Sequence, residues 1–148
     1  MQLKNNHILF FCTGNYYRSR FAELYFNHLA SAQDLTIRAY SKGLRPSPNN
    51  EGPISPHTKK YLETQGLEIP IPKWPEITNI EDFEAPAKVI AMDREEHEPM
   101  MKNSFPQYQE RIEYWSFADD YITEPKIILP ALQLKVDEFF EQFLVHSK

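Results

Sequence analysis

The feature that most constrains the fold of this chain is the string Cys12-Thr13-Gly14-Asn15-Tyr16-Tyr17-Arg18-Ser19, which directly follows the apolar run His7–Phe11. That run is short and rich in aromatic residues, which predicts a buried strand. Gly14 and Asn15 tolerate positive φ, as a loop that folds around an anion requires. After Ser19, apolar residues recur at helical spacing. The order of strand, loop and helix therefore predicts a small cup at a strand end.

Such a cup has the parts needed for chemistry on phosphate. Successive backbone N–H groups of the loop form a nest for an oxyanion, and a helix that begins at Arg18 or Ser19 adds its positive end to the field. The same field favours the thiolate form of Cys12. Arg18 offers a planar two-pronged donor to two phosphate oxygens. The alternative is a buried structural cysteine beside an unrelated surface arginine.

Length and composition fit one globular domain. The chain has 148 residues, 41% of them hydrophobic and 25% charged, which allows a real core. Its net charge of −5 argues against nucleic acid or an anionic membrane as the main partner. No apolar run has transmembrane length, and the N-terminus lacks a signal-peptide pattern. Cys12 is the only cysteine, so no internal disulfide forms, and a reducing cytoplasm is the expected location.

The remaining pattern alternates strands with helices. Strands are expected at His7–Phe11, Leu35–Tyr40, Ala87–Met92 and Ile112–Trp115, and helices at Ser19–Ala32, from the Ser55-Pro56 cap to Gly66, after Asp93, and from Pro130 to the end of an apolar stripe at Phe143. Two segments, Ser41–Pro56 and Pro70–Asp82, read as loops that border the pocket.

This alternation predicts an α/β fold in a single three-layer domain over residues 1–148. A four-stranded parallel sheet is covered by helices on both faces, and the phosphate loop follows strand one. The ligand is expected at the carboxyl ends of the strands, where Cys12 lies.

The loop resembles that of the low-molecular-weight protein tyrosine phosphatases, and of the arsenate reductases that share their fold. The family pattern Cys-x-Gly-Asn-x-x-Arg-Ser is matched by Cys12, Gly14, Asn15, Arg18 and Ser19. The resemblance implies a phosphomonoesterase that hydrolyses phosphotyrosine through a phosphocysteine intermediate, without cofactor or metal. Members often carry a second cysteine before the arginine, where this chain has Tyr17, so the thiol that would trap Cys12 in a reversible disulfide is missing.

The resemblance also implies an acid in the loop after the fourth strand. Family members carry Asp-Pro there, often followed by an aromatic residue. Aligning Tyr121 with that aromatic places Asp119 on the general acid and Asp120 on the proline. Asp120 is a possible substitute, and a solvated acidic turn is the alternative interpretation.

Supporting and substrate-binding residues follow from the same match. Ser41 is expected to hold Asn15, Ser19 to donate its hydroxyl to the Cys12 thiolate, and Asp93 either to orient Arg18 or to cap the helix that follows it. The expected substrate contacts are Thr13, Gly14, Asn15, Tyr16, Tyr17, Ser19 and Tyr121, with the three tyrosines as aromatic walls. Most other tyrosine and phenylalanine residues are assigned to core or ordinary surface, and Trp74 and Trp115 are assigned to the core. The histidines show no metal-ligand spacing, and His97 with Glu95, Glu96 and Glu98 reads as a solvated helix face.

Three functions are compatible with these residues. The leading one is the phosphatase, whose ligands would be phosphotyrosine-containing proteins or small aryl phosphates, with inorganic phosphate or vanadate as competitors. The second is an arsenate reductase that uses an external thiol, since the thioredoxin-linked form needs further cysteines. The third is a non-catalytic phosphotyrosine-binding module, suggested by the missing proline and by Tyr17.

Overall fold

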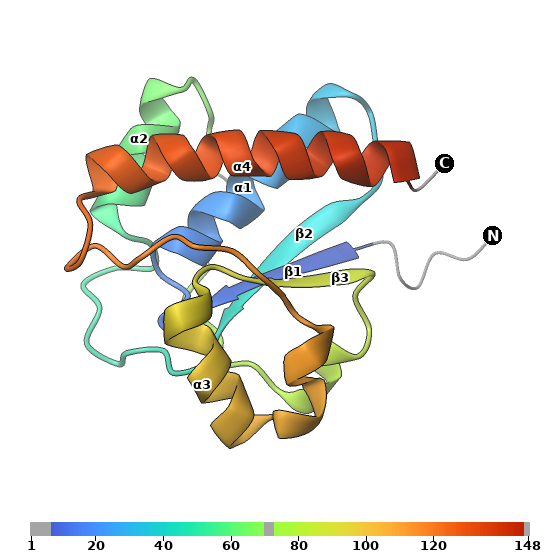
Figure 1. The fold of residues 1–148 in the computed structure, drawn as a ribbon. Coiled ribbons are helices and arrows are strands. Elements are labelled where there is room, and N and C mark those ends of the chain that lie inside the picture. The colour runs from blue at the N-terminus through green and yellow to red at the C-terminus, as the bar shows by residue number, and fades with distance from the viewer. Residues whose placement is uncertain (1–6, 70–72, 147–148) are drawn as a thin grey trace.

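The computed structural model describes residues 7–69 and 73–146, with residues 145 and 146 described by their backbone alone. Its centre is a parallel sheet with the strand order β2-β1-β3-β4. The strands are β1 (His7–Cys12), β2 (Arg38–Gly43), β3 (Lys88–Ala91) and β4 (Glu113–Tyr114) (Figure 1). The predicted α/β fold, with a loop after strand one, is confirmed.

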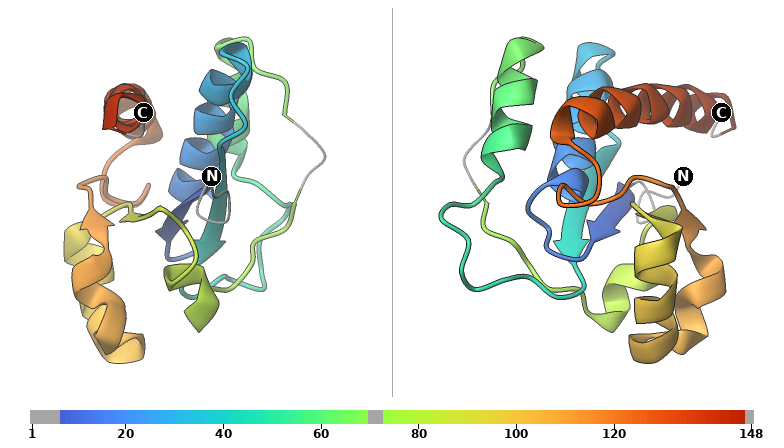
Figure 2. Two further views of the ribbon diagram at one scale, coloured as in Figure 1. Left: turned by 90° about the vertical axis from the view of Figure 1, so that its right-hand side faces the viewer. Right: turned by 60° about the vertical axis from the view of Figure 1, so that its left-hand side comes forward.

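Helices cover both faces of the sheet. On one side lie α1 (Arg18–Ala32), α2 (Pro56–Thr64) and α4 (Pro125–His146), and on the other lies α3 (Arg94–Ser104) with the short 3-10 helices Ile80–Phe83 and Pro106–Arg111 (Figures 1 and 2). Strand β1 feeds both cores because its side chains alternate: Ile8 and Phe10 pack with the first group of helices, and Leu9 and Phe11 with the second.

Local signals in the sequence set several helix ends. The Ser55 hydroxyl accepts the backbone N–H of His57 at 3.2 Å, Pro56 opens α2, and Gly66 follows the helix with φ of 82°. The apolar stripe of the last helix is also in place, with Leu132, Val136 and Phe140 buried.

Some predicted boundaries are wrong. Strand β2 begins at Arg38 because it pairs in register with β1, His7 opposite Arg38 and Cys12 opposite Gly43, whereas the Leu35 amide closes the end of α1 on the Ala30 carbonyl. The loop expected from Ser41 therefore starts only after Gly43.

The last helix also starts earlier than predicted, at Pro125. The amides of Ile127 and Ile128 bond to the Glu124 carbonyl, so the helix is established before Pro130, which lies inside it. Trp115 is buried as expected, but Trp74 is 59% exposed. Of the proline-rich segment Pro70–Asp82, residues 70–72 lie outside the described part of the chain, and the rest runs beside Gly43.

Gly43 is the position where the sheet and the loop after β1 meet most closely. A Cβ atom there would lie 2.8 Å from the Thr13 carbonyl oxygen and 3.0 Å from the Asn15 Cβ and amide nitrogen. Contacts this short with backbone atoms cannot be relieved by a side-chain rotation. Only glycine lets β2 end against the loop.

Gly43→Ala is therefore expected to lower the free energy of unfolding by about 1–3 kcal/mol, as overpacking does, and to lower turnover because the loop must shift. Urea unfolding and aryl phosphate hydrolysis measure the two effects. The matched control is Gly52→Ala, where a Cβ meets nothing within 4 Å. Equal stabilities for the two variants would contradict this account of Gly43.

Candidate active site

The cup lies where β1 ends and α1 begins. Carbonyls of the connecting loop are fixed from outside: Cys12 accepts the Leu44 amide at 3.0 Å, Thr13 the Arg45 amide at 2.8 Å and Tyr16 the Ser55 amide at 2.9 Å. Tyr17, at the N-cap of α1, makes no side-chain hydrogen bond to the first turn within the described chain. The loop and first-turn amides are the donors expected to form the oxyanion nest.

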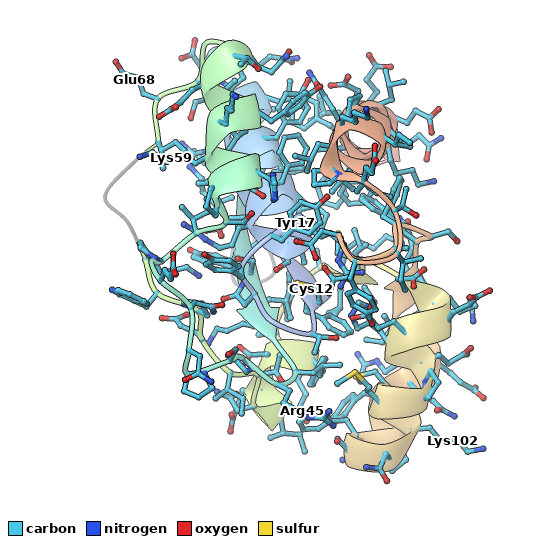
Figure 3. All side chains as sticks on the ribbon, turned by 90° about the vertical axis from the view of Figure 1, so that its left-hand side faces the viewer. Cys12, Tyr17, Arg45, Lys59, Glu68 and Lys102 are labelled. Atoms are coloured by element: carbon cyan, nitrogen blue, oxygen red, sulfur yellow. The ribbon has the colours of Figure 1, made fainter. Side chains whose placement is uncertain are left out.

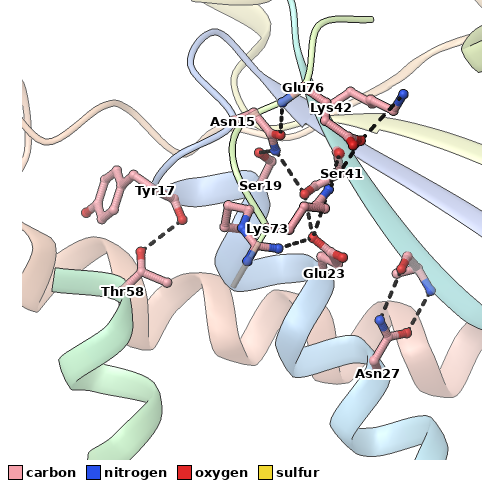
Figure 4. Close-up of polar contacts among 12 residues, drawn as sticks. Asn15, Tyr17, Ser19, Glu23, Asn27, Ser41, Lys42, Thr58, Lys73 and Glu76 are labelled. Carbon is pink, nitrogen blue, oxygen red and sulfur yellow. Dashed lines mark hydrogen bonds and ion pairs between the residues drawn. The ribbon is translucent and has the colours of Figure 1, made fainter. Parts of the chain in front are cut away.

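Asn15 holds the shape of the loop. Its φ is 53°, its Nδ2 donates to Ser41 Oγ at 2.9 Å and to Ser19 Oγ at 3.1 Å, and its Oδ1 accepts the Glu76 amide at 2.9 Å (Figure 4). The predicted contact between Ser41 and Asn15 is present. The contact with Glu76, on the segment after residue 72, could not be predicted from the sequence, because Glu76 takes part through its backbone amide and any residue could do so.

The buried carboxylate of Glu23 orients Ser41 for its contact with Asn15. Ser41 donates its hydroxyl to Glu23 Oε1 at 2.5 Å, so its oxygen lone pairs are left for Asn15, and Glu23 also pairs with Arg20 at 2.6 Å. Lys73 adds a bond from Nζ to the Ser41 carbonyl at 3.0 Å (Figure 4). Sequence reasoning missed Arg20 and Glu23, although charged residues three apart among the buried positions of α1 were a readable signal.

The thiol of Cys12 lies at the base of the cup. Cys12 is 2% exposed, and its Sγ is 3.0 Å from Ser19 Oγ. Because Ser19 already accepts from Asn15, its own hydrogen is available to the sulfur. This is the arrangement predicted for a hydroxyl that stabilises a thiolate.

Arg18 is buried, with 1% of its surface exposed, and is held by two elements. Its Nη1 and Nη2 each donate to a Glu96 carboxylate oxygen at 2.9 Å, and Nη1 also donates to the Phe117 carbonyl at 2.8 Å. Asp119 Oδ2 lies 3.5 Å from Nη2. The Nε–H has no acceptor among the described residues.

The interpretation of the α3 acidic face as solvated is wrong for Glu96 and His97. His97 is fully buried and accepts the Asp93 amide at Nδ1, at 3.1 Å. The hydrogen of the neutral ring is therefore on Nε2, 3.2 Å from a Glu96 oxygen. Thr13 Oγ1 donates to the same oxygen at 2.5 Å. Burial raises the pKa of Glu96, but the bonds from His97, Arg18 and Thr13, together with the charge of Arg18, hold that pKa well below 4.5.

Asp93 makes neither of the two side-chain bonds expected of it, although the charge of Arg18 acts on its carboxyl. Its backbone has the extended N-cap geometry, but its side chain makes no capping bond and no bond to Arg18 among the described contacts. Burial raises its pKa. Glu96, three residues further along and hence on the same helix face, holds Arg18 instead.

Asp119 and Asp120 both face the cup. The hollow measures about 370 Å³ and is lined by Cys12, Thr13, Gly14, Tyr16, Tyr17, Arg18, Arg45, Ser47, Asn50, Asp119 and Asp120. The Asp119 carbonyl accepts the amides of Ile122 and Thr123, and its Oδ1 accepts the Asp120 amide at 2.9 Å. This turn orders the loop without the proline that family members carry at the position of Asp120.

The three predicted tyrosine walls differ. Tyr16 is half-buried at the rim, whereas Tyr121 is 80% exposed and does not line the hollow. Tyr17 is buried in the wall, and its hydroxyl has no partner within the described residues. Burial and the charge of Asp120 raise the pKa of Tyr17, so it remains a hydrogen-bond donor. Arg45, Ser47 and Asn50 complete the rim from a loop that carries no sequence motif.

A buried thiol, an anion nest and an arginine at the carboxyl edge of a parallel sheet define a cysteine-dependent enzyme of phosphate ester chemistry. Figure 3 looks onto this face, with Cys12 and Tyr17 near its centre and Arg45 below them. The described residues contain no cluster of three or more His, Cys, Asp or Glu that could hold a metal. Nor does the described part contain a helix long and apolar enough to cross a membrane.

The family model for low molecular weight phosphotyrosine protein phosphatase matches residues 7–127, and the chain belongs to this family of cysteine-based phosphatases. It is 28% identical over 110 residues to the protein-arginine-phosphatase of Bacillus subtilis (strain 168), which covers 71% of this chain and 67% of that protein.

Solved structures share the fold. The crystal structure of YfkJ from Bacillus subtilis has a TM-score of 0.83 at 20% identity, over 96% of each chain. SP-PTP, a low molecular weight protein tyrosine phosphatase from Streptococcus pyogenes, has a TM-score of 0.76 at 20% identity, over 92% of this chain and 91% of that one.

Glu96→Gln tests the role of the carboxylate that holds Arg18. Removing one partner of a buried pair costs about 3–5 kcal/mol, and we expect a loss at the lower end because the amide oxygen still accepts. The pKa of folded Glu96 lies below 4.5, so its stabilisation is present above about pH 4.5 and is lost as the pH falls below it. Urea unfolding is measured at pH 7 and at pH 3. The difference in the free energy of unfolding between wild type and Glu96→Gln should be smaller at pH 3.

The control for this variant is Glu95→Gln, which neutralises an exposed carboxylate on the same helix turn. It is expected to change stability by less than about 0.5 kcal/mol. If the difference in the free energy of unfolding between wild type and Glu96→Gln is the same at both pH values, the stabilisation does not come from an ionised Glu96.

Proposed function

We propose that this phosphatase hydrolyses phosphotyrosine residues of cytoplasmic proteins, with Cys12 as nucleophile, Arg18 as phosphate clamp and Asp119 as general acid. The observation that carries the proposal is the convergence of these three side chains on one hollow. Asp119 lies 3.5 Å from the Arg18 guanidinium and lines the same hollow as Cys12, which supports its assignment as the acid that protonates the leaving group.

The reaction has two steps. The Cys12 thiolate attacks phosphorus, a sulfur–phosphorus bond forms, and the ester oxygen–phosphorus bond breaks as Asp119 gives its proton to the departing phenolate. Loop amides and Arg18 stabilise the charge on the equatorial oxygens. Water, deprotonated by Asp119, then attacks the phosphocysteine and releases inorganic phosphate. The thiolate that leaves is stabilised by the Ser19 hydroxyl, 3.0 Å away.

The walls of the cup support an aryl substrate. Tyr16 and Tyr17 form one side of the hollow, and the thiol lies at its base with 2% exposure. A long, flat side chain reaches that depth with its ring against the aromatic wall, which a phosphoserine is too short to do.

A second candidate substrate is phosphoarginine. It is favoured by the similarity to the protein-arginine-phosphatase and by two carboxylates, Asp119 and Asp120, at the mouth, which would pair with a guanidinium. An arsenate reductase would still need an external thiol, because Cys12 is the only cysteine in the sequence.

Cys12→Ser is expected to abolish hydrolysis of p-nitrophenyl phosphate at pH 5–6 in the absence of metal, while inorganic phosphate or vanadate still protects the variant against unfolding. Rapid mixing of wild type should give a burst of p-nitrophenolate before steady turnover. A wild type that binds vanadate without turnover would instead be the non-catalytic binding module.

Asp119→Asn is expected to lower kcat by about 10²–10⁴ for a poor leaving group such as tyrosine, and by less for p-nitrophenol, which departs without a proton. Asp120→Asn is the matched control, one residue away and also at the rim. Assays on phosphotyrosine and phosphoarginine peptides decide the substrate class. A larger loss for Asp120→Asn would move the acid to that residue.

A further inference from the structure

A second hollow adjoins the cup and is not used by the reaction. It measures about 610 Å³ and lies between the loop around Gly52 and the first turns of α2. Tyr16 lines both hollows, so they are separated by the width of one side chain. Lys59, which lines the second hollow, projects from the outer side of α2 in the same view as Cys12 (Figure 3).

The two hollows are tied to each other by hydrogen bonds. The Ser55 amide donates to the Tyr16 carbonyl at 2.9 Å, and Thr58 Oγ1 donates to the Tyr17 carbonyl at 2.9 Å (Figure 4). Both Ser55 and Thr58 are buried. The start of α2 is therefore fixed on the catalytic loop, and the second hollow keeps a constant distance from Cys12.

The walls of this hollow are mostly apolar. Pro53, Ile54, Pro56 and Ile69 provide them together with the Tyr16 ring, and the charged residues Glu51, Lys59 and Glu63 also line it. An apolar lining with a few polar groups is typical of a site that buries an apolar group of a ligand. Both signs of charge are present, so the lining favours neither a strongly acidic nor a strongly basic occupant.

We infer that this hollow is a substrate subsite that takes an apolar side chain next to the phosphorylated residue of a protein substrate. The inference rests on the proposed function. A residue whose phosphate lies on Cys12 brings its own backbone to the rim at Tyr16. An extended chain advances about 3.3 Å per residue, so a neighbour one or two positions away lies over the second hollow. Leucine, isoleucine or methionine fits the apolar walls.

The test is a scan of short peptides. Each peptide carries one phosphorylated residue in a serine-glycine background, with a single leucine moved from two positions before it to two positions after it. Phosphotyrosine and phosphoarginine series are run in parallel. Leucine at one position should raise kcat/KM by about tenfold over the parent peptide, since burial of a leucine side chain supports a change of that size. Hydrolysis of p-nitrophenyl phosphate is measured alongside.

Gly52→Phe fills the hollow, and Gly52→Ala is its matched control. A Cβ at Gly52 meets nothing within 4 Å, so the backbone there has room for the first atom of either side chain. Gly52→Phe should remove the gain from leucine and leave p-nitrophenyl phosphate hydrolysis within twofold of wild type, whereas Gly52→Ala should keep the gain.

The outcomes separate the two claims. If wild type hydrolyses p-nitrophenyl phosphate but gains from leucine at no position, or if Gly52→Phe keeps the gain, the subsite is wrong and the proposed function stands. If Gly52→Phe slows the small substrate as much as the peptides, the hollow belongs to the cup itself and the subsite is again wrong. Turnover on none of the substrates overturns the proposed function, and the subsite with it.

Discussion

The site depends on one constraint, the left-handed backbone of Asn15 in the loop between β1 and α1. A nest of inward-facing amides repels itself when no anion fills it, so something outside must hold it open. The Asn15 side chain does so through three bonds, to Ser19, Ser41 and the Glu76 amide. Those partners come from α1, β2 and the segment beside β2, so the shape of the cup is as stable as the packing of these elements. Gly43 belongs to the same constraint, because any side chain there would push the loop away.

Charge is distributed around the cup so that each buried group has a counter-charge. Arg18 is nearly inaccessible and is paired with Glu96, which is itself held by His97 and Thr13. A buried arginine without a partner would be costly and mobile, and the pair fixes two of its nitrogens. On the other side of the loop, the pair Arg20–Glu23 orients Ser41 in the same manner. One pair holds Arg18 directly, and the other acts on Asn15 through Ser41.

In the proposed mechanism, reactivity and selectivity have separate structural origins. The residues proposed for catalysis lie within eight consecutive residues and in one loop after β4, whereas the rim and the adjoining hollow come from the loop after β2 and from α2. Hydrogen bonds from Ser55 and Thr58 join these parts. Because the two parts are separate, changes in the loop after β2 or in α2 can alter substrate selection without changing the geometry of the cup.

The sequence by itself determined the strand, loop and helix around Cys12 and the parallel sheet, because these follow from local periodicity and a dense motif. The contacts of Ser19 and Ser41 were implied by the family resemblance. Only the tertiary structure decided that Glu96 rather than Asp93 holds Arg18, that His97 is buried, and that Tyr121 points to solvent. A run such as Arg94-Glu95-Glu96-His97-Glu98 looks solvated in sequence, since its charges dominate any local pattern. Its inner face is identified only when α3 packs against the loop and brings it to a buried cation 78 residues away.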